Sequence, residues 1–284
     1  MRPIAVVTDS TASLPAGLVE AAEVVVVPLD VVIDGVAHRE GVDISPGRII
    51  EALRAGVPVR TAHPGPEVFA RAYARVAARG AREIVSVHLS GELSGTVTAA
   101  RLGAQMAGVP VHVVDSRTVG MGLGFGVLAA ARLAAEQDLP DGAAVARSAE
   151  RRAAGTSVRF TVDTLEHLRA GGRLGPLAAT LGTVLGLRPV LGVRDGKLEV
   201  EAKVRTSARS RERVVELAIA DARRRARCEL AVHHLGDPEL ARDVAERLAS
   251  ECRPSVHAVH AAEISAVIGA HAGPGLLAVV VSDA

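Results

Sequence analysis

Residues 90–96, SGELSGT, concentrate the small hydroxyl and glycine residues that can bind an anion. An apolar, β-rich run at 83–89 ends directly before them, and an Ala-rich helical pattern extends from Ser94 to about Ala107. Unpaired backbone N–H groups at the start of a helix attract phosphate or carboxylate without a lysine. Ser and Thr also favour helix N-caps for local reasons, so this loop indicates either an anion site or an ordinary cap.

Four more loops and one glycine-rich segment have a similar composition near the ends of expected strands. They are residues 8–11, 61–66, 115–118 and 270–275, together with 171–175, which contains Arg173. Because ligands of parallel α/β sheets bind beyond the carboxyl ends of the strands, these loops predict a cleft with hydroxyls, one arginine and one histidine. Such a cleft would suit an anionic head group. Turn and cap chemistry accounts equally well for each loop taken alone.

Two enzyme motifs resemble parts of these loops but are out of register. A nucleophile elbow needs G-x-S-x-G, whereas residues 91–95, GELSG, have Ser94 one position late. A dinucleotide-binding turn needs G-x-G-x-x-G directly after a strand, and the glycine-rich residues 120–126 miss that spacing. An alternative is a hydrolase or transferase for a small carboxylate or phosphate, with Ser94 as nucleophile and His271 as base. The sequence names no acidic residue to orient that histidine.

The elements that position the loops follow two patterns. Residues 1–154 alternate strands with helical stretches, which predicts βαβ crossovers and a mainly parallel sheet. Residues 197–204 alternate charged and apolar side chains after a turn at Asp195 and Gly196, which predicts an antiparallel sheet with one wet face. We therefore expect an α/β fold with two domains: 1–154, with flanking helices, and 155–284, an α+β domain with a largely antiparallel sheet. The ligand should bind in the cleft between them.

Several local expectations can be tested directly. Ser13 should cap a helix, residues 24–33 should form one long β-run before a turn, and residues 61–66 should form a loop. Asp115 has the pattern of a helix cap. Residues 177–185 repeat leucine every four positions beside glycines, so this expected helix should leave room beside a ligand or pack closely on a sheet.

Composition narrows the class of protein further. The chain has 284 residues, 49% of them apolar but only 1% aromatic, so an apolar ligand would lie in an aliphatic channel. The net charge of +1, with both signs interspersed, does not favour nucleic acid or an anionic membrane. We expect a cytoplasmic protein, because the first strand begins near the N-terminus without a signal segment and no apolar run reaches the ~18 residues of a membrane span.

Cysteine and histidine spacing favours no metal site. Cys228 and Cys252 are isolated and are expected to be buried thiols, and the ten histidines form no HExxH pattern. His233 and His234 are neighbours in an expected strand and should point to opposite faces. The sequence has no heptad repeat of the kind that predicts coiled-coil assembly, so we expect a monomer.

Seven segments occur in an order that resembles a known family. They are TDSTASL at 8–14, TAHPGP at 61–66, SGELSGT at 90–96, VDSRTVGMGLG at 114–124, GRL at 172–174 leading to LRPVL at 187–191, RT at 205–206, and GPG at 273–275. They resemble the TDSTADL, TSQPSP, SSxLSGT, VDSxxxSMGxG, GRIS…LNIKPIL, RTR and TGPG elements of the DegV family. The resemblance extends over nearly the whole chain.

This resemblance implies a two-domain α/β protein that binds a long-chain fatty acid and has no catalytic apparatus or cofactor of its own. It also implies that the carboxylate is presented to a separate fatty acid kinase, which forms acyl phosphate for phospholipid metabolism, with at most transient membrane contact. By position, the carboxylate binders would be Thr61, Ser94 with the Gly95 N–H, Arg173 and His271. A lipid-sensing regulator is a further alternative.

The chain departs from the family pattern at four positions. Ala62 and His63 replace Ser and Gln, and Gly91 replaces the second serine of its loop, which could change how a head group is hydrogen-bonded. Ser207 replaces the last Arg of RTR, in the region that the family is thought to use for docking the kinase. Burial of an acyl chain gains roughly 0.8 kcal/mol per CH₂, so an aliphatic channel can dominate the affinity.

Overall fold

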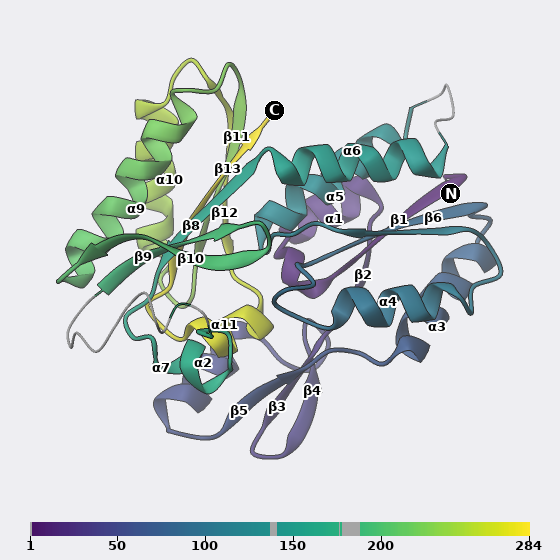
Figure 1. Cartoon of the computed structure of the whole chain (residues 1–284), viewed down its shortest axis with the longest axis horizontal. Helices are drawn as coiled ribbons and strands as arrows, with labels where there is room; N and C mark the ends of the chain where they lie inside the picture. The colour runs from purple at the N-terminus through teal and green to yellow at the C-terminus, as the bar shows by residue number, and fades with distance from the viewer. Residues whose placement is uncertain (1, 137–140, 176, 178–187) are drawn as a thin grey trace.

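In the computed structural model, which describes residues 2–136, 141–175, 177 and 188–284, the first half of the chain forms a parallel sheet, sheet A. Its strands follow the order β2-β1-β6-β7, and β1 is buried along its whole length. The bounds are β1 Ile4–Asp9, β2 Val25–Val27, β6 Glu83–His88 and β7 Val111–Asp115. Helices α5 and α6 cover one face and α3 and α4 the other (Figure 1), which explains why the strands are apolar on both sides.

The helices of this half differ in length. Their bounds are α1 Ala16–Ala22, α2 Pro46–Arg54, α3 Pro66–Ala78, α4 Thr96–Ala104, α5 Met121–Leu133 and α6 Gly142–Ala154. A short 3-10 helix, η1 (Ser10–Ala12), follows β1. Pro46 and Pro66 occupy the first helical positions of α2 and α3, where a missing N–H costs nothing.

The second half contributes a mostly antiparallel sheet, sheet D, with the order β10-β9-β8-β13-β11-β12. Its strands are β8 Thr156–Thr161, β9 Arg188–Arg194, β10 Lys197–Val204, β11 Cys228–His234, β12 Val256–Glu263 and β13 Leu277–Asp283. Of the described strand pairs in sheet D, only β11 and β12 are parallel. Helices α9 (Ser207–Ala222) and α10 (Pro238–Glu251) pack on one face through Val214, Leu230, Leu248 and Leu277.

A small antiparallel sheet, sheet B, lies below sheet A in Figure 1. It has the order β4-β3-β5, with β3 Asp30–Ile33, β4 Val36–Arg39 and β5 Val59–Ala62. Helix α2 and helix α11 (Ala266–Ala272), which comes from the end of the chain, pack against it, and α7 (Glu166–Ala170) packs on α11. Residues far apart in sequence therefore meet beside sheet B.

Both ends of helix α11 are hydrogen-bonded to residues in or next to sheet B. At its start, the buried Glu40 carboxylate accepts hydrogen bonds from Ala266 N–H and, at 3.0 Å, from the Ser265 hydroxyl. Burial raises the pKa of Glu40 above its usual value. At its end, His271 Nε2 lies 2.8 Å from Thr61 Oγ1 of β5. These contacts fix the helix relative to the small sheet.

The predicted fold class is confirmed, but some local expectations were wrong. Residues 24–33 are not one strand: β2 belongs to sheet A and β3 to sheet B, and Pro28 lies between them, where it lacks the N–H that a continuous ladder needs. Residues 61 and 62 end β5 and do not belong to a loop. Ser13 does not start a helix, because it ends η1 with φ of 50° and α1 begins after Pro15.

Three further expectations concern Asp115, the two cysteines and residues 177–185. Asp115 caps no helix; its carboxylate accepts hydrogen bonds from the N–H groups of Gly91 and Arg117. Cys228 and Cys252 are buried, as predicted, and burial raises the pKa of both thiols. The expected helix at 177–185 lies outside the described residues, apart from Leu177.

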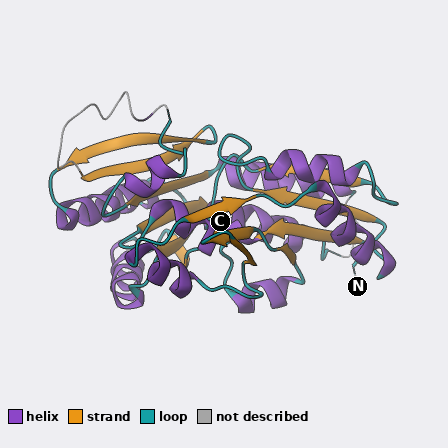
Figure 2. Ribbon diagram, turned by 90° about the horizontal axis from the view of Figure 1, so that it is seen from below, coloured by secondary structure: helices purple, strands orange, loops and turns teal. Residues whose placement is uncertain are grey.

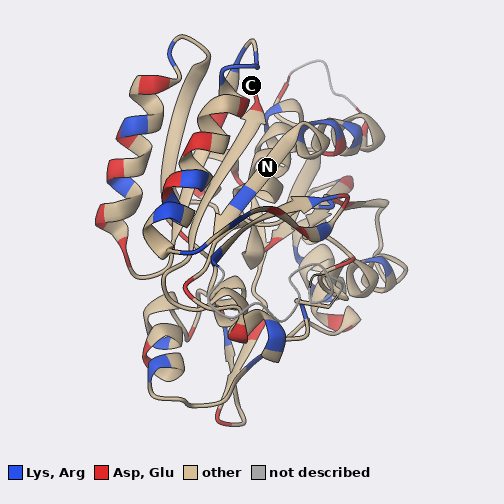
Figure 3. Cartoon of the chain, turned by 60° about the vertical axis from the view of Figure 1, so that its left-hand side comes forward, with Lys and Arg blue, Asp and Glu red and all other residues tan. Residues whose placement is uncertain are grey.

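The surface carries both charges in close mixture. Figure 3 shows basic and acidic residues interspersed along the helices that cover sheet D. Figure 2 shows the elongated molecule with its strands running between helices. In the part of the chain that the structure describes, each helix is too short or too polar to span a bilayer. The division at residues 154 and 155 stays a prediction.

Candidate ligand-binding site

A cavity with mostly apolar walls lies where the three sheets approach one another. The loop after β6 contributes Leu89, β5 of sheet B contributes Thr61, and β8 of sheet D contributes Phe160. Further apolar wall residues are Leu29, Val158, Leu198, Ile264, Leu276 and Ala278. The apolar side chains of the wall are aliphatic apart from Phe160, as the composition predicted for a site that takes an apolar ligand.

The cavity is small. Its volume is about 100 Å³. Small-molecule pockets enclose roughly 300–1,000 Å³, so wall side chains must move apart to admit a long alkyl chain. The apolar lining suits a chain of this kind.

Four polar side chains of the lining are linked to one another directly or through a neighbouring residue, and we call this part of the cavity the head-group end: Thr61, Ser94, Arg173 and His271. His271 Nε2 and Thr61 Oγ1 form a hydrogen bond of 2.8 Å. Burial, followed by the nearby Arg173 cation, lowers the pKa of His271 to about 4. The imidazole is therefore neutral at neutral pH, and Arg173 supplies the positive charge at this end.

The position of the His271 proton follows from its surroundings. Nδ1 is buried without a hydrogen-bond partner among the described residues and lies against Gly171, where a Cβ would collide with it. Buried N–H groups are almost always paired, so we assign the proton to Nε2. Nε2–H then donates to the Thr61 hydroxyl oxygen. The hydroxyl hydrogen of Thr61 stays available for an anion.

Arg173 is held by backbone carbonyls on two sides. Its Nε donates to Leu93 O at 3.1 Å, and its Nη1 donates to Gly171 O at 2.6 Å. A guanidinium carries five N–H donors, so these contacts leave others to bind a carboxylate. The contact with Leu93 also joins Arg173 to the loop that carries Ser94.

The loop at 90–96 presents Ser94 at the start of α4. Ser94 Oγ lies 2.9 Å from Thr96 Oγ1, and the N-cap of α4 is Gly95, which has no side chain to cap the first turn. The Gly95 N–H follows Ser94 directly. The sequence therefore forms a helix start whose donors can turn to a ligand.

Neighbouring elements tie this loop in place. Ser90 Oγ donates to Gly196 O at 2.8 Å, which joins the loop to the β9–β10 turn. Gly91 N–H lies 3.2 Å from both Asp115 carboxylate oxygens. A Cβ at Gly91 would come within 2.8 Å of Asp115 Oδ2, so the glycine permits this approach.

The structure thus brings the four predicted side chains to one end of one cavity, with Gly95 next to Ser94. They come from β5, the 90–96 loop, the segment after α7 and helix α11. Their role as carboxylate binders stays a prediction.

Sequence reasoning missed His233 as a wall residue. Its Nε2 accepts from Met121 N–H at 3.0 Å, and its Nδ1 donates to Ala262 O at 3.1 Å. Complete burial lowers its pKa to about 4, so it is a neutral ring with both nitrogens used. In the sequence, His233 is one of two adjacent histidines in an expected strand, and that pattern does not predict that it lines a cavity.

A buried polar network also went unpredicted. Asp9 Oδ2 pairs with His88 Nδ1 at 2.9 Å, and His88 Nε2 lies 2.7 Å from Ser86 Oγ, which accepts from Tyr73. The Asp9 carboxylate also accepts from the N–H groups of Thr11 and Leu89. Thr11 and Leu89 line the cavity, so this network positions part of its wall.

The arrangement does not assemble a nucleophile and base. Ser94 Oγ bonds to Thr96 and His271 bonds to Thr61, with no Ser94–His271 hydrogen bond in the described structure. Within the described ranges, three or more His, Cys, Asp or Glu side chains nowhere cluster as a metal would require. The side chains present can bind an anion beside an apolar cavity.

Comparisons with known proteins agree with this architecture. The family model described as "Uncharacterised protein, DegV family" matches residues 3–284. A DegV domain-containing protein of Streptomyces coelicolor is 48% identical over 282 residues, 99% of each chain, and one of Deinococcus radiodurans is 39% identical over 287 residues, 97% of each.

Solved structures are similar over the whole chain. A DegV family protein from Thermus thermophilus, described as fatty acid binding, superposes with a TM-score of 0.90 at 36% identity and 100% coverage of both chains. DegV of Bacillus subtilis, described as a fatty acid binding protein, has a TM-score of 0.90 at 28% identity, again with 100% coverage of both.

Proposed function

This chain belongs to the DegV family, and from that premise we propose that it binds a long-chain fatty acid and presents the carboxylate to a separate fatty acid kinase. The observation that carries the proposal is the mostly apolar cavity whose lining includes Thr61, Ser94, Arg173 and His271. The fatty acid binding described for the relatives from Thermus thermophilus and Bacillus subtilis supports it.

The alkyl chain would supply most of the affinity. Each buried CH₂ contributes roughly 0.8 kcal/mol, so a chain of a dozen methylenes gains on the order of 10 kcal/mol before the costs of association. Leu198, Leu276 and Ala278 offer it an aliphatic wall. Without this wall, the few polar groups at the head-group end would hold only a weak ligand.

The carboxylate must not be buried unpaired, because that would cost several kcal/mol. In our proposal Arg173 neutralises its charge, and the hydroxyls of Thr61 and Ser94 and the Gly95 N–H donate hydrogen bonds. His271 acts by donating to Thr61, or by turning its Nε2–H to the carboxylate directly. The same groups then hold the carboxylate at the cavity mouth.

The kinase supplies the chemistry in this proposal. A carboxylate oxygen attacks the terminal phosphorus of a nucleoside triphosphate bound by the kinase, the bond to the nucleoside diphosphate breaks, and an acyl phosphate for phospholipid metabolism results. The chain itself needs no cofactor. Because the nucleotide is cytoplasmic, we place the protein there as a monomer of two domains, 1–154 and 155–284, that touches a membrane only transiently.

The proposal is tested by what the protein carries. Protein purified from cells and denatured should release fatty acid that mass spectrometry detects, and delipidated protein should bind hexadecanoate again. Addition of the kinase and a nucleoside triphosphate should then form acyl phosphate. Protein that is free of lipid and also fails to bind added fatty acids would contradict the proposal.

A further inference from the structure

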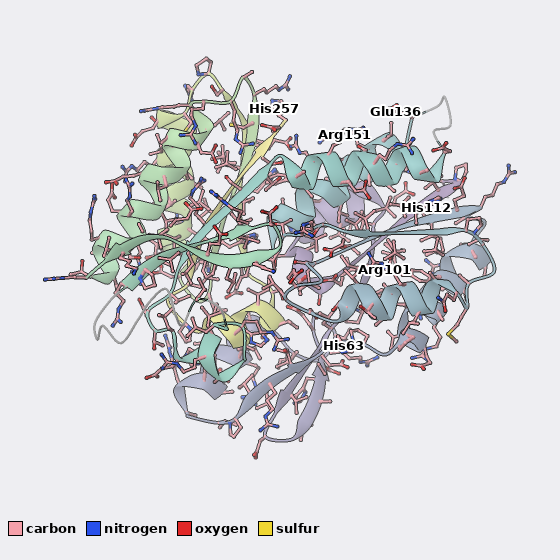
Figure 4. All side chains as sticks on the ribbon, in the orientation of Figure 1. His63, Arg101, His112, Glu136, Arg151 and His257 are labelled. Carbon is pink, nitrogen blue, oxygen red and sulfur yellow. The ribbon has the colours of Figure 1, made fainter. Side chains whose placement is uncertain are left out.

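His63 lies just outside the cavity, beside its head-group end. It follows β5 by one residue and is exposed. Its Cδ2 and Nε2 lie 3.0 Å from the place that a Cβ of Gly95 would occupy, so the ring rests on Gly95, next to Ser94. Figure 4 labels His63 between sheet B and the start of α4.

The hydrogen bonds of His63 leave one nitrogen free. Nδ1 lies 3.3 Å from Pro64 O. Nε2 makes no hydrogen bond to any residue that the structure describes. It lies on the Gly95 side of the ring and is open to a group that emerges from the cavity.

We propose that His63 binds the phosphoryl group of the acyl phosphate that is held in the cavity. This inference rests on the proposed function. Once the carboxylate carries a phosphoryl group, that group is disfavoured in the apolar part of the cavity. In the proposal it extends past Gly95, where the His63 ring lies, and Nε2–H of His63 donates to a phosphoryl oxygen.

The charges around His63 fit an anionic group of this size. The charged or titratable side chains on the elements that meet here are Arg60, Glu67, Glu92, Arg101, Arg173 and His271. Glu92 pairs with Lys197 at 3.6 Å, and Arg173 faces the cavity. A phosphoryl group would then lie between the Arg173 guanidinium and the His63 ring.

The test compares two ligands with the same acyl chain. Hexadecanoate has the carboxylate alone, and the ketophosphonate analogue of hexadecanoyl phosphate, with a methylene in place of the bridging oxygen, has both carbonyl and phosphoryl groups. His63→Ala should weaken ketophosphonate binding roughly tenfold or more, as expected for one charge-assisted hydrogen bond, and change hexadecanoate binding less than about twofold. His63→Gln, an uncharged donor, should lie between.

A matched variant and a spectroscopic signature make the test specific. His257 is also exposed but lies at the far end of the molecule in Figure 4, and His257→Ala should change neither affinity. The NMR signal of the His63 ring should shift with the ketophosphonate and stay in place with hexadecanoate. Equal effects of His63→Ala on both ligands, or on neither, would overturn the inference. Wild-type protein that binds neither ligand would overturn the proposed function instead.

Discussion

The mostly apolar body of the cavity and its head-group end each have one histidine in the lining, and the two rings are used differently. In the apolar body, His233 has both nitrogens bonded to backbone groups. At the head-group end, His271 bonds only to Thr61, and its Nδ1 has no partner among the described residues. The histidine of the apolar body therefore has both ring nitrogens paired without a ligand, whereas the head-group end has hydrogen-bonding groups left for one. Function is expected where the protein leaves its own polar groups incompletely paired.

The largest expected effect is on stability, and it separates the two histidines. His233→Leu would leave the buried Met121 N–H and Ala262 C=O unpaired, so it should lower the free energy of unfolding by about 3 kcal/mol at pH 7. His271→Leu removes only the bond to Thr61 and should cost about 1 kcal/mol. Urea unfolding of both variants measures the difference.

The same two variants should alter the response to acid. The folded protein holds both histidines neutral, with pKa values of about 4, whereas unfolded histidine takes up a proton near pH 6.5. The unfolded state thus binds more protons below pH 6.5, and stability should fall from there to about pH 4, by about 3 kcal/mol per histidine. Each leucine variant should lack the part of this pH dependence that its histidine contributes. Equal losses of unfolding free energy at pH 7, with an unchanged pH dependence, would contradict the prediction that the two histidines are used differently.

A second prediction separates head group from chain. Arg173→Ala should weaken hexadecanoate binding roughly a hundredfold, because the buried carboxylate loses its counter-charge. Binding of hexadecanol, which has no charge, should change little. Isothermal titration with both ligands measures this, with Arg169→Ala, an exposed arginine of α7, as control. If the alcohol and the acid lose equal affinity, Arg173 acts by shaping the loop and not by binding the anion.

The smallest effect is expected in the apolar body. Ala278 lies in the wall on β13 and is 5% exposed. Ala278→Leu would fill part of the channel and should weaken hexadecanoate binding about tenfold, while decanoate should bind nearly as before. A competition series of chain lengths measures this. The opposite outcome, in which decanoate suffers more, would place Ala278 near the head group.

The sequence predicted the polar end of the site better than its walls. Thr61, Ser94, Arg173 and His271 lie in sequence segments that are rich in small or polar residues, and such composition is visible in a single sequence. His233 gave no such signal, because its role depends on Met121 N–H, which is 112 positions away. Long-range hydrogen bonds of this kind are fixed by packing and leave no local pattern.

The large sheets were also easier to predict than the small one. The strands of sheet A are separated by helices, and strand β10 of the β9–β10 hairpin alternates apolar and charged residues. Sheet B is built from three strands of four residues, and β5 begins at Val59, 23 residues after the start of β4 at Val36. Short strands carry too few residues for a periodic pattern.

The double attachment of α11 limits how the cavity mouth can open. Glu40 holds its first turn and Thr61 its last, and both residues belong to the segment that forms and borders sheet B. Any widening of the mouth beside His271 must therefore move helix and sheet as a single body, or else break one anchor. A carboxylate that draws the Thr61 hydroxyl toward itself would weaken only the attachment at the end of α11. Ligand binding would then be coupled to the stiffness of this part of the wall.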